Sequence, residues 1–285
     1  MSSQLQQSQI AFIGGGNMAS AIIGGLTAKG IDKQHVVVSE PWDVNRAKMA
    51  EAGVRTTASN AEAARDADIV ILAVKPQVAR GVCEELSASF SPAKQPLVIS
   101  IVAGITAESL RAWLSSSNKS GGAPHVVRVM PNTPALVGEG ASGLYAGSDV
   151  TAAEKELAAA LLSSVSKATE WVDREELLDV VTGLSGSGPA YFFALVEHLI
   201  ASATALGLAP EQATRLAKQT CLGAGRMLAE SAEDPSQLRR NVTSPKGTTE
   251  AALQSFEASG LAASVDKAVK AAVDRAEELG KTLGS

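Results

Sequence analysis

Ile10-Ala11-Phe12-Ile13-Gly14-Gly15-Gly16-Asn17-Met18-Ala19 is the stretch that decides the fold. An apolar run with the character of a buried strand leads into Gly-x-Gly-x-x-Ala, and a helical pattern follows. Gly14 permits a tight turn, Gly16 lets a pyrophosphate approach the backbone, and Ala19 allows the helix to pack closely on the strand. The motif alone is weak evidence. In this strand-turn-helix context it predicts a dinucleotide site.

The chain from Ile10 to about Val172 alternates short β-branched runs with alanine-rich helical stretches, which is typical of a parallel, doubly wound sheet. The predicted strands are 10–13, 36–39, 69–74, 97–102 and 126–130, with edge strands at 142–146 and 169–172. The predicted helices are 17–29, 44–52, 60–65, 78–87, 107–113 and 152–164. Ser115 to Pro124 reads as a surface loop.

After Asp173 the pattern is helical throughout. The predicted helices are 175–184, 189–206, 210–231, 235–241, 247–259 and 261–283. Ala190 to Leu206 and Ala213 to Leu228 are apolar over arcs too wide for a small bundle to cover, so we expect at least a homodimer. The sequence thus predicts a disordered tail (1–9), an α/β Rossmann domain (10–172) and an all-α helical substrate-binding and dimerisation domain (173–285).

Composition excludes several classes of function. The chain of 285 residues carries a net charge of −5 without a basic cluster, which argues against nucleic acid as a partner. Its two cysteines and three histidines lack the spacing of metal ligands, so we expect no metal and reduced thiols in a cytoplasmic protein. The amino terminus lacks the pattern of a secretory signal, and no apolar run is long enough to span a membrane.

The end of the second strand bears on the choice of nicotinamide cofactor. Ser39 and Arg46 suit the 2′-phosphate of NADP(H), whereas Glu40 suits the free ribose of NAD(H). We favour NADP(H) and keep NAD(H) as the alternative. Lys75, at the end of the strand that precedes Pro76, is either a cofactor contact or a solvated lysine.

A polar turn, Val242-Thr243-Ser244-Pro245-Lys246-Gly247-Thr248-Thr249, runs into an apolar-periodic helix. Ser244 stands where an N-cap belongs and Pro245 at the first helical position. Free amides and the helix dipole favour an anion there, such as a carboxylate. A plain capped surface helix is the simpler interpretation, but a glycine inside the first turn and two following threonine hydroxyls exceed what a cap needs.

Two further stretches are rich in glycine and proline, Met130-Pro131-Asn132-Thr133-Pro134 and Gly183-Leu184-Ser185-Gly186-Ser187-Gly188-Pro189-Ala190-Tyr191. Together with the glycine turn, Ala73 to Pro76 and Ser244 to Thr249, in this order, they resemble the pyrroline-5-carboxylate reductase family over essentially the whole chain. The resemblance implies NAD(P)H-dependent reduction of 1-pyrroline-5-carboxylate to L-proline, the last step of proline biosynthesis, by an oxidoreductase acting on a CH-NH bond. It also implies an interlocked dimer, with dimers often assembling into a homodecamer.

Carried onto this sequence, the resemblance places two groups of residues. Those expected to bind the cofactor are Gly14, Gly16, Asn17, Met18, Ser39, Asn60, Ala73, Val74, Lys75 and Pro76. Those expected to hold the substrate are Ser244, Gly247, Thr248 and Thr249. Glu40 departs from the pattern expected of a member that prefers the phosphorylated cofactor, and this leaves the cofactor preference open.

The chemistry of an imine fits these residues. A protonated cyclic imine is already electrophilic, so the site needs mainly orientation and carboxylate binding. Thr249 is the candidate catalytic residue, because its hydroxyl is suited to hydrogen-bond the ring nitrogen, while backbone amides from Ser244 to Thr248 hold the carboxylate. A β-hydroxyacid dehydrogenase or other imine reductase would carry a lysine where this chain has Pro189, Ala190 and Tyr191. A dinucleotide-binding sensor without turnover is the alternative from another class.

Overall fold

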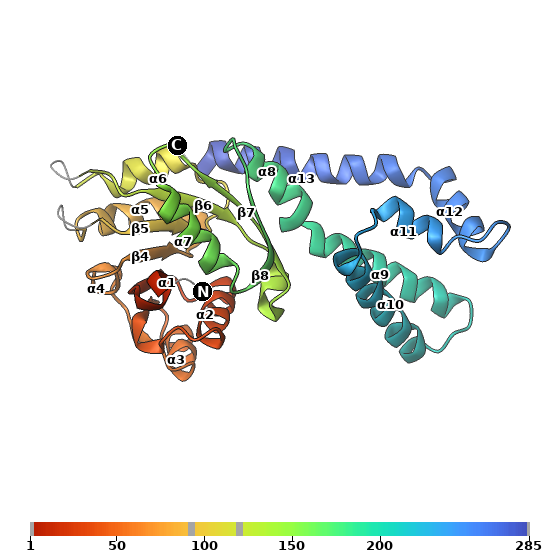
Figure 1. Cartoon of the computed structure of the whole chain (residues 1–285), viewed down its shortest axis with the longest axis horizontal. Coiled ribbons are helices and arrows are strands. Elements are labelled where there is room, and N and C mark those ends of the chain that lie inside the picture. The colour runs from red at the N-terminus through yellow and green to blue at the C-terminus, as the bar shows by residue number, and fades with distance from the viewer. Residues whose placement is uncertain (1–2, 91–94, 118–121, 284–285) are drawn as a thin grey trace. The chain divides into compact units, whose positions relative to one another are not determined.

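The computed structural model describes residues 3–90, 95–117 and 122–283. The chain divides into two compact units, Met1–Gly186 with Ala272–Ser285, and Ser187–Ala271. Figure 1 labels their elements. The first unit continues past the boundary expected near residue 172, because α8 (Leu177–Val181) packs on the sheet and buries Leu178. Residues 118–121 of the expected surface loop lie outside the described residues.

Within the described ranges, the first unit is built on one eight-stranded sheet in the order β3-β2-β1-β4-β5-β6-β7-β8. The strands are β1 (Ile10–Ile13), β2 (Val36–Ser39), β3 (Arg55–Thr57), β4 (Ile69–Leu72), β5 (Leu97–Ser100), β6 (Val126–Met130), β7 (Gly140–Ala146) and β8 (Ser166–Trp171). The strand order reverses between β1 and β4. Dinucleotides bind at such a switch point, beyond the carboxyl ends of the strands.

Two features of the sheet differ from the sequence prediction. The pair β6–β7 is antiparallel, with Val127 opposite Ala146 and Met130 opposite Gly143. The reason is the short connection through η2 (Thr133–Val137), since a parallel return needs a crossover of about a dozen residues or more. The short strand β3 was not predicted, because its residues include no apolar run.

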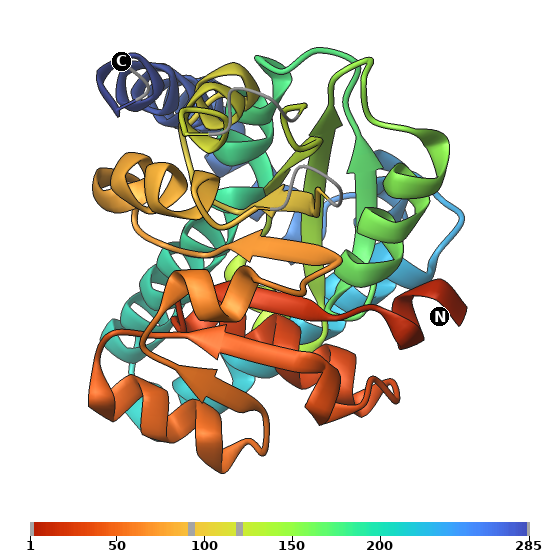
Figure 2. The same ribbon diagram turned by 90° about the vertical axis from the view of Figure 1, so that its left-hand side faces the viewer.

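Helices cover both faces of this sheet (Figure 2). Alternate residues of β1 enter two separate cores, Ile10 and Phe12 in one, Ala11 and Ile13 in the other. The first core contains side chains of α2 and α7, and the second contains side chains of α5 and α6. The remaining bounds are α1 (Ser3–Gln7), α2 (Asn17–Ala28), η1 (Lys33–His35), α3 (Asp43–Glu51), α4 (Asn60–Ala64), α5 (Pro76–Ser87), α6 (Ala107–Leu114), α7 (Ala152–Leu162) and η3 (Thr182–Gly186).

The segment expected to be a disordered tail contains the helix α1. That expectation is wrong for these residues, because Leu5 is fully buried in the first core and α1 packs against α7. The hydroxyl of Ser8 donates to the carbonyl of Gln4 at 2.8 Å and closes the end of the helix.

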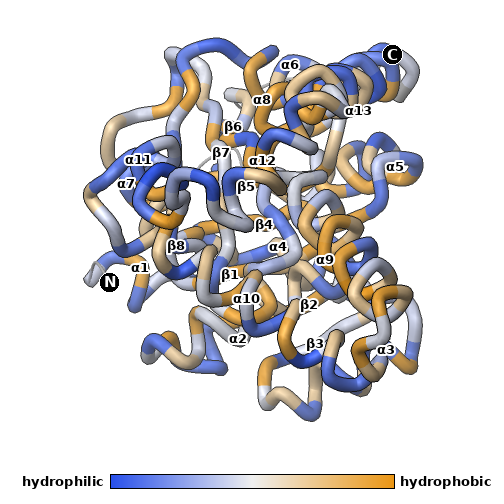
Figure 3. The backbone as a smooth tube through the Cα atoms, turned by 90° about the vertical axis from the view of Figure 1, so that its right-hand side faces the viewer, coloured by the Kyte–Doolittle hydropathy of each residue, from blue (hydrophilic) through white to orange (hydrophobic). Residues whose placement is uncertain are grey.

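The second unit is helical, as predicted. Its helices are α9 (Gly188–Ala205), α10 (Pro210–Glu230), α11 (Pro235–Asn241) and α12 (Thr248–Ala258), and α13 (Leu261–Leu283) begins in this unit while its last residues belong to the first. Hydrophobic residues recur along α9 and α10 (Figure 3). Many of them are exposed in the single chain, including Phe193 at 69% and Leu222 at 58%.

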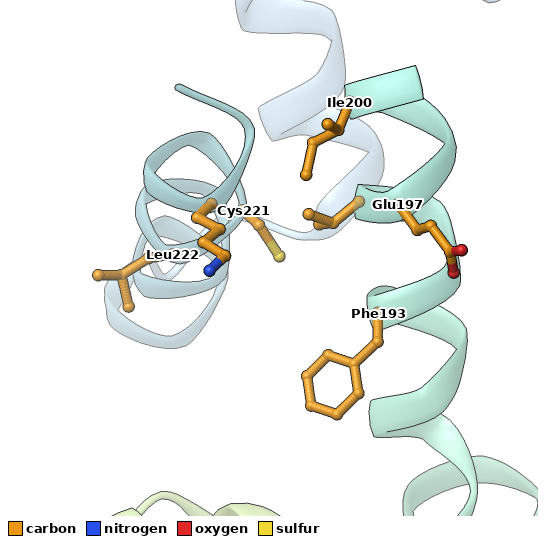
Figure 4. A pocket seen from close by; sticks show the side chains of 7 residues that line it. Phe193, Glu197, Ile200, Cys221 and Leu222 are labelled. Carbon is orange, nitrogen blue, oxygen red and sulfur yellow. The ribbon is translucent and has the colours of Figure 1, made fainter. Parts of the chain in front are cut away.

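Side chains of α9 and α10, mostly apolar, line a cavity of about 600 Å³ (Figure 4). Phe193 and Ile200 come from α9, and Cys221 and Leu222 from α10. An apolar surface of this kind is typical of a protein interface. Across the described residues, no helix has the length and apolar character needed to cross a membrane.

Candidate active site

The glycine turn joins β1 to α2 at the switch point of the sheet. Gly14 has a φ of +103°, and its amide donates to the carbonyl of Ser39 at 2.8 Å. Gly16 is the N-cap residue of α2, and no side chain caps this helix. A Cβ on Gly16 would have no neighbour within 4 Å. The first-turn residues Asn17 and Met18 therefore begin a helix with backbone amides suited to a pyrophosphate.

Ala73 to Pro76 follow β4 and lie directly beside this turn. A Cβ on Gly14 would lie 2.6 Å from the carbonyl oxygen of Ala73 and 3.3 Å from Cγ1 of Val74. Lys75 is the exposed N-cap residue of α5, and Pro76 opens that helix. The structure thus brings these two predicted cofactor segments together.

Ser39 and Asn60, two of the predicted cofactor contacts, also meet in the structure. The hydroxyl of Ser39, at the end of β2, donates to Oδ1 of Asn60 at 2.7 Å. The side-chain amide of Asn60 donates in turn to Oε2 of Glu85, on α5, at 2.8 Å. Glu85 fixes the orientation of the Asn60 amide. The sequence analysis missed this role, because a single glutamate on an exposed helical face gives no signal.

Glu40 and Arg46 both interact within the protein. Oε2 of Glu40 accepts from the amide of Gly15 at 2.9 Å, and Oε1 accepts from the amide of Trp42 at 3.0 Å. The guanidinium of Arg46 donates to the Glu40 carbonyl at 2.8 Å and is paired with Asp43. Both side chains therefore have partners within the protein, so Glu40 is not simply available to a free ribose nor Arg46 to a 2′-phosphate, the two alternatives that the sequence left open.

The two other glycine- and proline-rich stretches contact each other in the first unit. Asn132 is buried, its side-chain amide donates to the carbonyl of Ser185 at 3.1 Å, and its Oδ1 accepts from the amide of Ala141 at 2.9 Å. A Cβ on Gly186 would lie 2.6 Å from Cε of Met130. Residues Thr182–Gly186 form a π-helical turn, a feature common at functional sites.

In the second unit, the polar turn before α12 differs from the predicted cap. The N-cap residue is Gly247 and the helix begins at Thr248, so Ser244 is not the N-cap and Pro245 is not in the helix. The amide of Gly247 donates to the Ser244 carbonyl at 3.0 Å, and this closes a turn that delays the helix. Lys246 lies within that turn with a φ of +60°.

Two amides of this turn already have partners. The amide of Lys246 donates to Oε2 of Glu250 at 2.7 Å, and the amide of Gly247 donates to the carbonyl of Ser244. No side chain caps α12, so the amides of Thr248 and Thr249 lie at an uncapped helix start. The side chain of Thr249 is half-buried. This end of α12 is therefore chemically suited to a small carboxylate.

Fold and site together define an NAD(P)-dependent oxidoreductase with a Rossmann unit and a helical dimerisation domain. Residues 9–104 match the family model described as NADP oxidoreductase, coenzyme F420-dependent, and residues 175–279 match the model for pyrroline-5-carboxylate reductase dimerisation. The pyrroline-5-carboxylate reductase of Pseudomonas aeruginosa is 50% identical, covering 97% of this chain and 98% of the relative. The chain belongs to the pyrroline-5-carboxylate reductase family.

Solved structures agree with this assignment. A pyrroline-5-carboxylate reductase from Coxiella burnetii aligns with a TM-score of 0.87 and 42% identity, covering 95% of this chain and 98% of that one. The Plasmodium falciparum enzyme, solved with NADP bound, aligns with a TM-score of 0.81 and 30% identity, covering 96% and 99% of the two chains. Enzymes of this family catalyse the final step of proline biosynthesis with NAD(P)H.

Proposed function

We propose that this chain reduces 1-pyrroline-5-carboxylate to L-proline with NADPH as the preferred donor and NADH as the alternative. The observation that carries the proposal is the uncapped start of α12 at Thr248 and Thr249, in a member of this family. NAD(P)H supplies the hydride. The roles below belong to the residues of the chain.

The cofactor binds at the edge of the sheet where β1, β2 and β4 end. The uncapped amides at Asn17 and Met18 bind the pyrophosphate, and the open space beside Gly16 lets it approach. Preference for NADPH is supported by Asn60, whose side-chain amide has a second N–H besides the one that it donates to Glu85, and which the Ser39 hydroxyl orients. The inward hydrogen bonds of Glu40 occupy both of its oxygens, which removes the feature of the sequence that favoured a free ribose.

Substrate binding falls to the turn before α12. The sequence analysis assigned the carboxylate to the amides from Ser244 to Thr248. Because the amides of Lys246 and Gly247 have partners within the turn, we now assign it to the amides of Thr248 and Thr249, with Ser244 and Gly247 shaping the turn. The positive end of the α12 dipole adds to this attraction.

Thr249 orients the imine. Its hydroxyl hydrogen-bonds the ring nitrogen and so fixes the face of the electrophilic carbon that receives hydride. No strong acid is required at this position, because the imine is protonated before reduction. Orientation of a cation that is already activated is therefore the main contribution of the helical unit.

The test is consumption of reduced cofactor with 1-pyrroline-5-carboxylate. Thr249→Ala should lower turnover about ten- to a hundredfold, the scale of one lost hydrogen bond of about 1.5–3 kcal/mol. Thr249→Ser is the matched control, because it keeps the hydroxyl and should retain most of the activity. Equal rates for wild type and Thr249→Ala would remove Thr249 from the mechanism. A wild type that consumes no cofactor would refute the function itself, and kcat/KM values with NADPH and NADH decide the cofactor preference.

The proposed assembly is a homodimer formed through the apolar faces of α9 and α10, with dimers associating into a decamer. Exposure of Phe193 and Leu222 in the single chain supports the first contact. Light scattering during size-exclusion chromatography separates dimer from decamer. Free Cys83 and Cys221 support a reducing compartment such as the cytoplasm.

A further inference from the structure

Glu40 is a buried carboxylate that joins two turns. The residue is only 7% exposed. Its oxygens accept from the amide of Gly15, in the glycine turn, and from the amide of Trp42, the N-cap residue of α3. Contact with the glycine is close, because a Cβ on Gly15 would lie 3.2 Å from Oε2 of Glu40. The side chain therefore ties the end of β2 to the phosphate-binding turn.

The backbone of Glu40 is anchored as well. Its amide donates to the carbonyl of Thr57, on β3, at 3.0 Å, and its carbonyl accepts from Arg46 at 2.8 Å. In dinucleotide-binding domains, an acidic residue at this position commonly hydrogen-bonds the ribose. Here both carboxylate oxygens of Glu40 accept hydrogen bonds from backbone amides, and the residue is buried. Its side chain therefore serves the protein's own turns and not the ribose.

We propose that Glu40 is a positioning residue that holds the glycine turn in its pyrophosphate-binding shape and does not select between NADH and NADPH. The inference rests on binding of NAD(P)H at this turn. Three consecutive glycines give the turn wide conformational freedom, and the carboxylate restricts its middle residue. Both cofactors share the pyrophosphate, so loss of the restriction weakens both equally.

The direct test is fluorescence titration of NADPH and NADH against Glu40→Ala and Glu40→Gln. If Glu40→Ala leaves about a tenth of the molecules with a competent turn, both dissociation constants rise about tenfold, and their ratio stays within about twofold of wild type. Glu40→Gln keeps one acceptor oxygen, so its two dissociation constants should lie between those of wild type and Glu40→Ala. Weakening of NADH alone, a gain in NADPH affinity, or no change in either constant overturns the proposal.

Two further measurements keep the test decisive. The Gly15 amide should be protected from hydrogen exchange in the cofactor-free wild type and lose that protection in Glu40→Ala. Gly15→Ala perturbs the same contact from the other side, so the double variant should weaken binding by less than the product of the single effects. The proposal is contradicted if the double variant weakens binding by the full product of the single effects, or if exchange of the Gly15 amide is unchanged in Glu40→Ala. If Glu40→Ala fails to fold, Glu40→Gln and Gly15→Ala carry the comparison. These readouts do not need turnover, so they remain valid if the proposed reaction fails.

Discussion

Gly14 and Gly16 belong to one motif, but the structure predicts different consequences for their substitution. Gly14→Ala places a side chain on a residue with a φ of +103°, which costs about 1–2 kcal/mol or more. The new Cβ would lie 2.6 Å from the carbonyl oxygen of Ala73. That backbone is fixed by the hydrogen bond from Ala73 to Ile13 at 2.9 Å, so overpacking adds about 1–3 kcal/mol.

The expected loss for Gly14→Ala is therefore about 2–5 kcal/mol of unfolding free energy, measured by urea denaturation with circular dichroism. Gly16→Ala is the matched control. Gly16 has a φ of −74° and no neighbour for a Cβ, so stability should be unchanged or higher by up to about 1 kcal/mol. Its NADPH affinity should fall, because the Cβ occupies the path of the pyrophosphate. A loss below about 1 kcal/mol for Gly14→Ala would refute the steric argument.

Three further outcomes follow from single contacts. Lys246→Gly should raise the melting temperature and add about 0.5–1 kcal/mol of stability, because glycine relieves the φ of +60°; a lower melting temperature would contradict this. Burial alone would raise the pKa of Glu154, but hydrogen bonds from Thr151 and His125 outweigh it and lower the pKa. Glu154→Gln should thus cost about 1 kcal/mol at neutral pH, with a deficit that shrinks as pH falls below 4.5 in urea titrations. Burial, and secondarily the nearby carboxylate of Glu84, raises the pKa of the Cys83 thiol from 9.0 to about 12. Between pH 9.0 and about 12 the thiol therefore ionises only in the unfolded chain, and the free energy of unfolding falls as the pH rises. Cys83→Ala should flatten the decline, which wild type shows at up to about 1.4 kcal/mol per pH unit.

The Rossmann part of the fold was accessible from the sequence because its signals are local. Strands β1 and β2 have the predicted bounds, since each is a short apolar run ended by a turn. The antiparallel direction of β7 could not be predicted from the sequence, because it depends on how η2 directs the chain. The helix α1 was not predicted, because its stability depends on burying Leu5 among residues that are distant in the sequence.

The candidate site shows the same division. The tight turn at Gly14 could be predicted from the sequence, because the conformational freedom of a glycine backbone is a property of the residue itself. Partners were not: the inward hydrogen bonds of Glu40 and the restraint of Asn60 by Glu85 depend on tertiary contacts. The later start of α12 depends on the turn closed by Ser244 and Gly247, which competes with the cap that Ser-Pro suggests.

The first unit is assembled from two segments of the chain that are separated by the whole of the second unit. Gly280 lies so close to Gly104 that a Cβ on Gly280 would be 3.0 Å from the Gly104 carbonyl oxygen. Residues 187–271 are all synthesised between the two parts of this unit. The Rossmann unit can therefore complete its packing only after residues 187–271, which contribute nothing to it, have been synthesised.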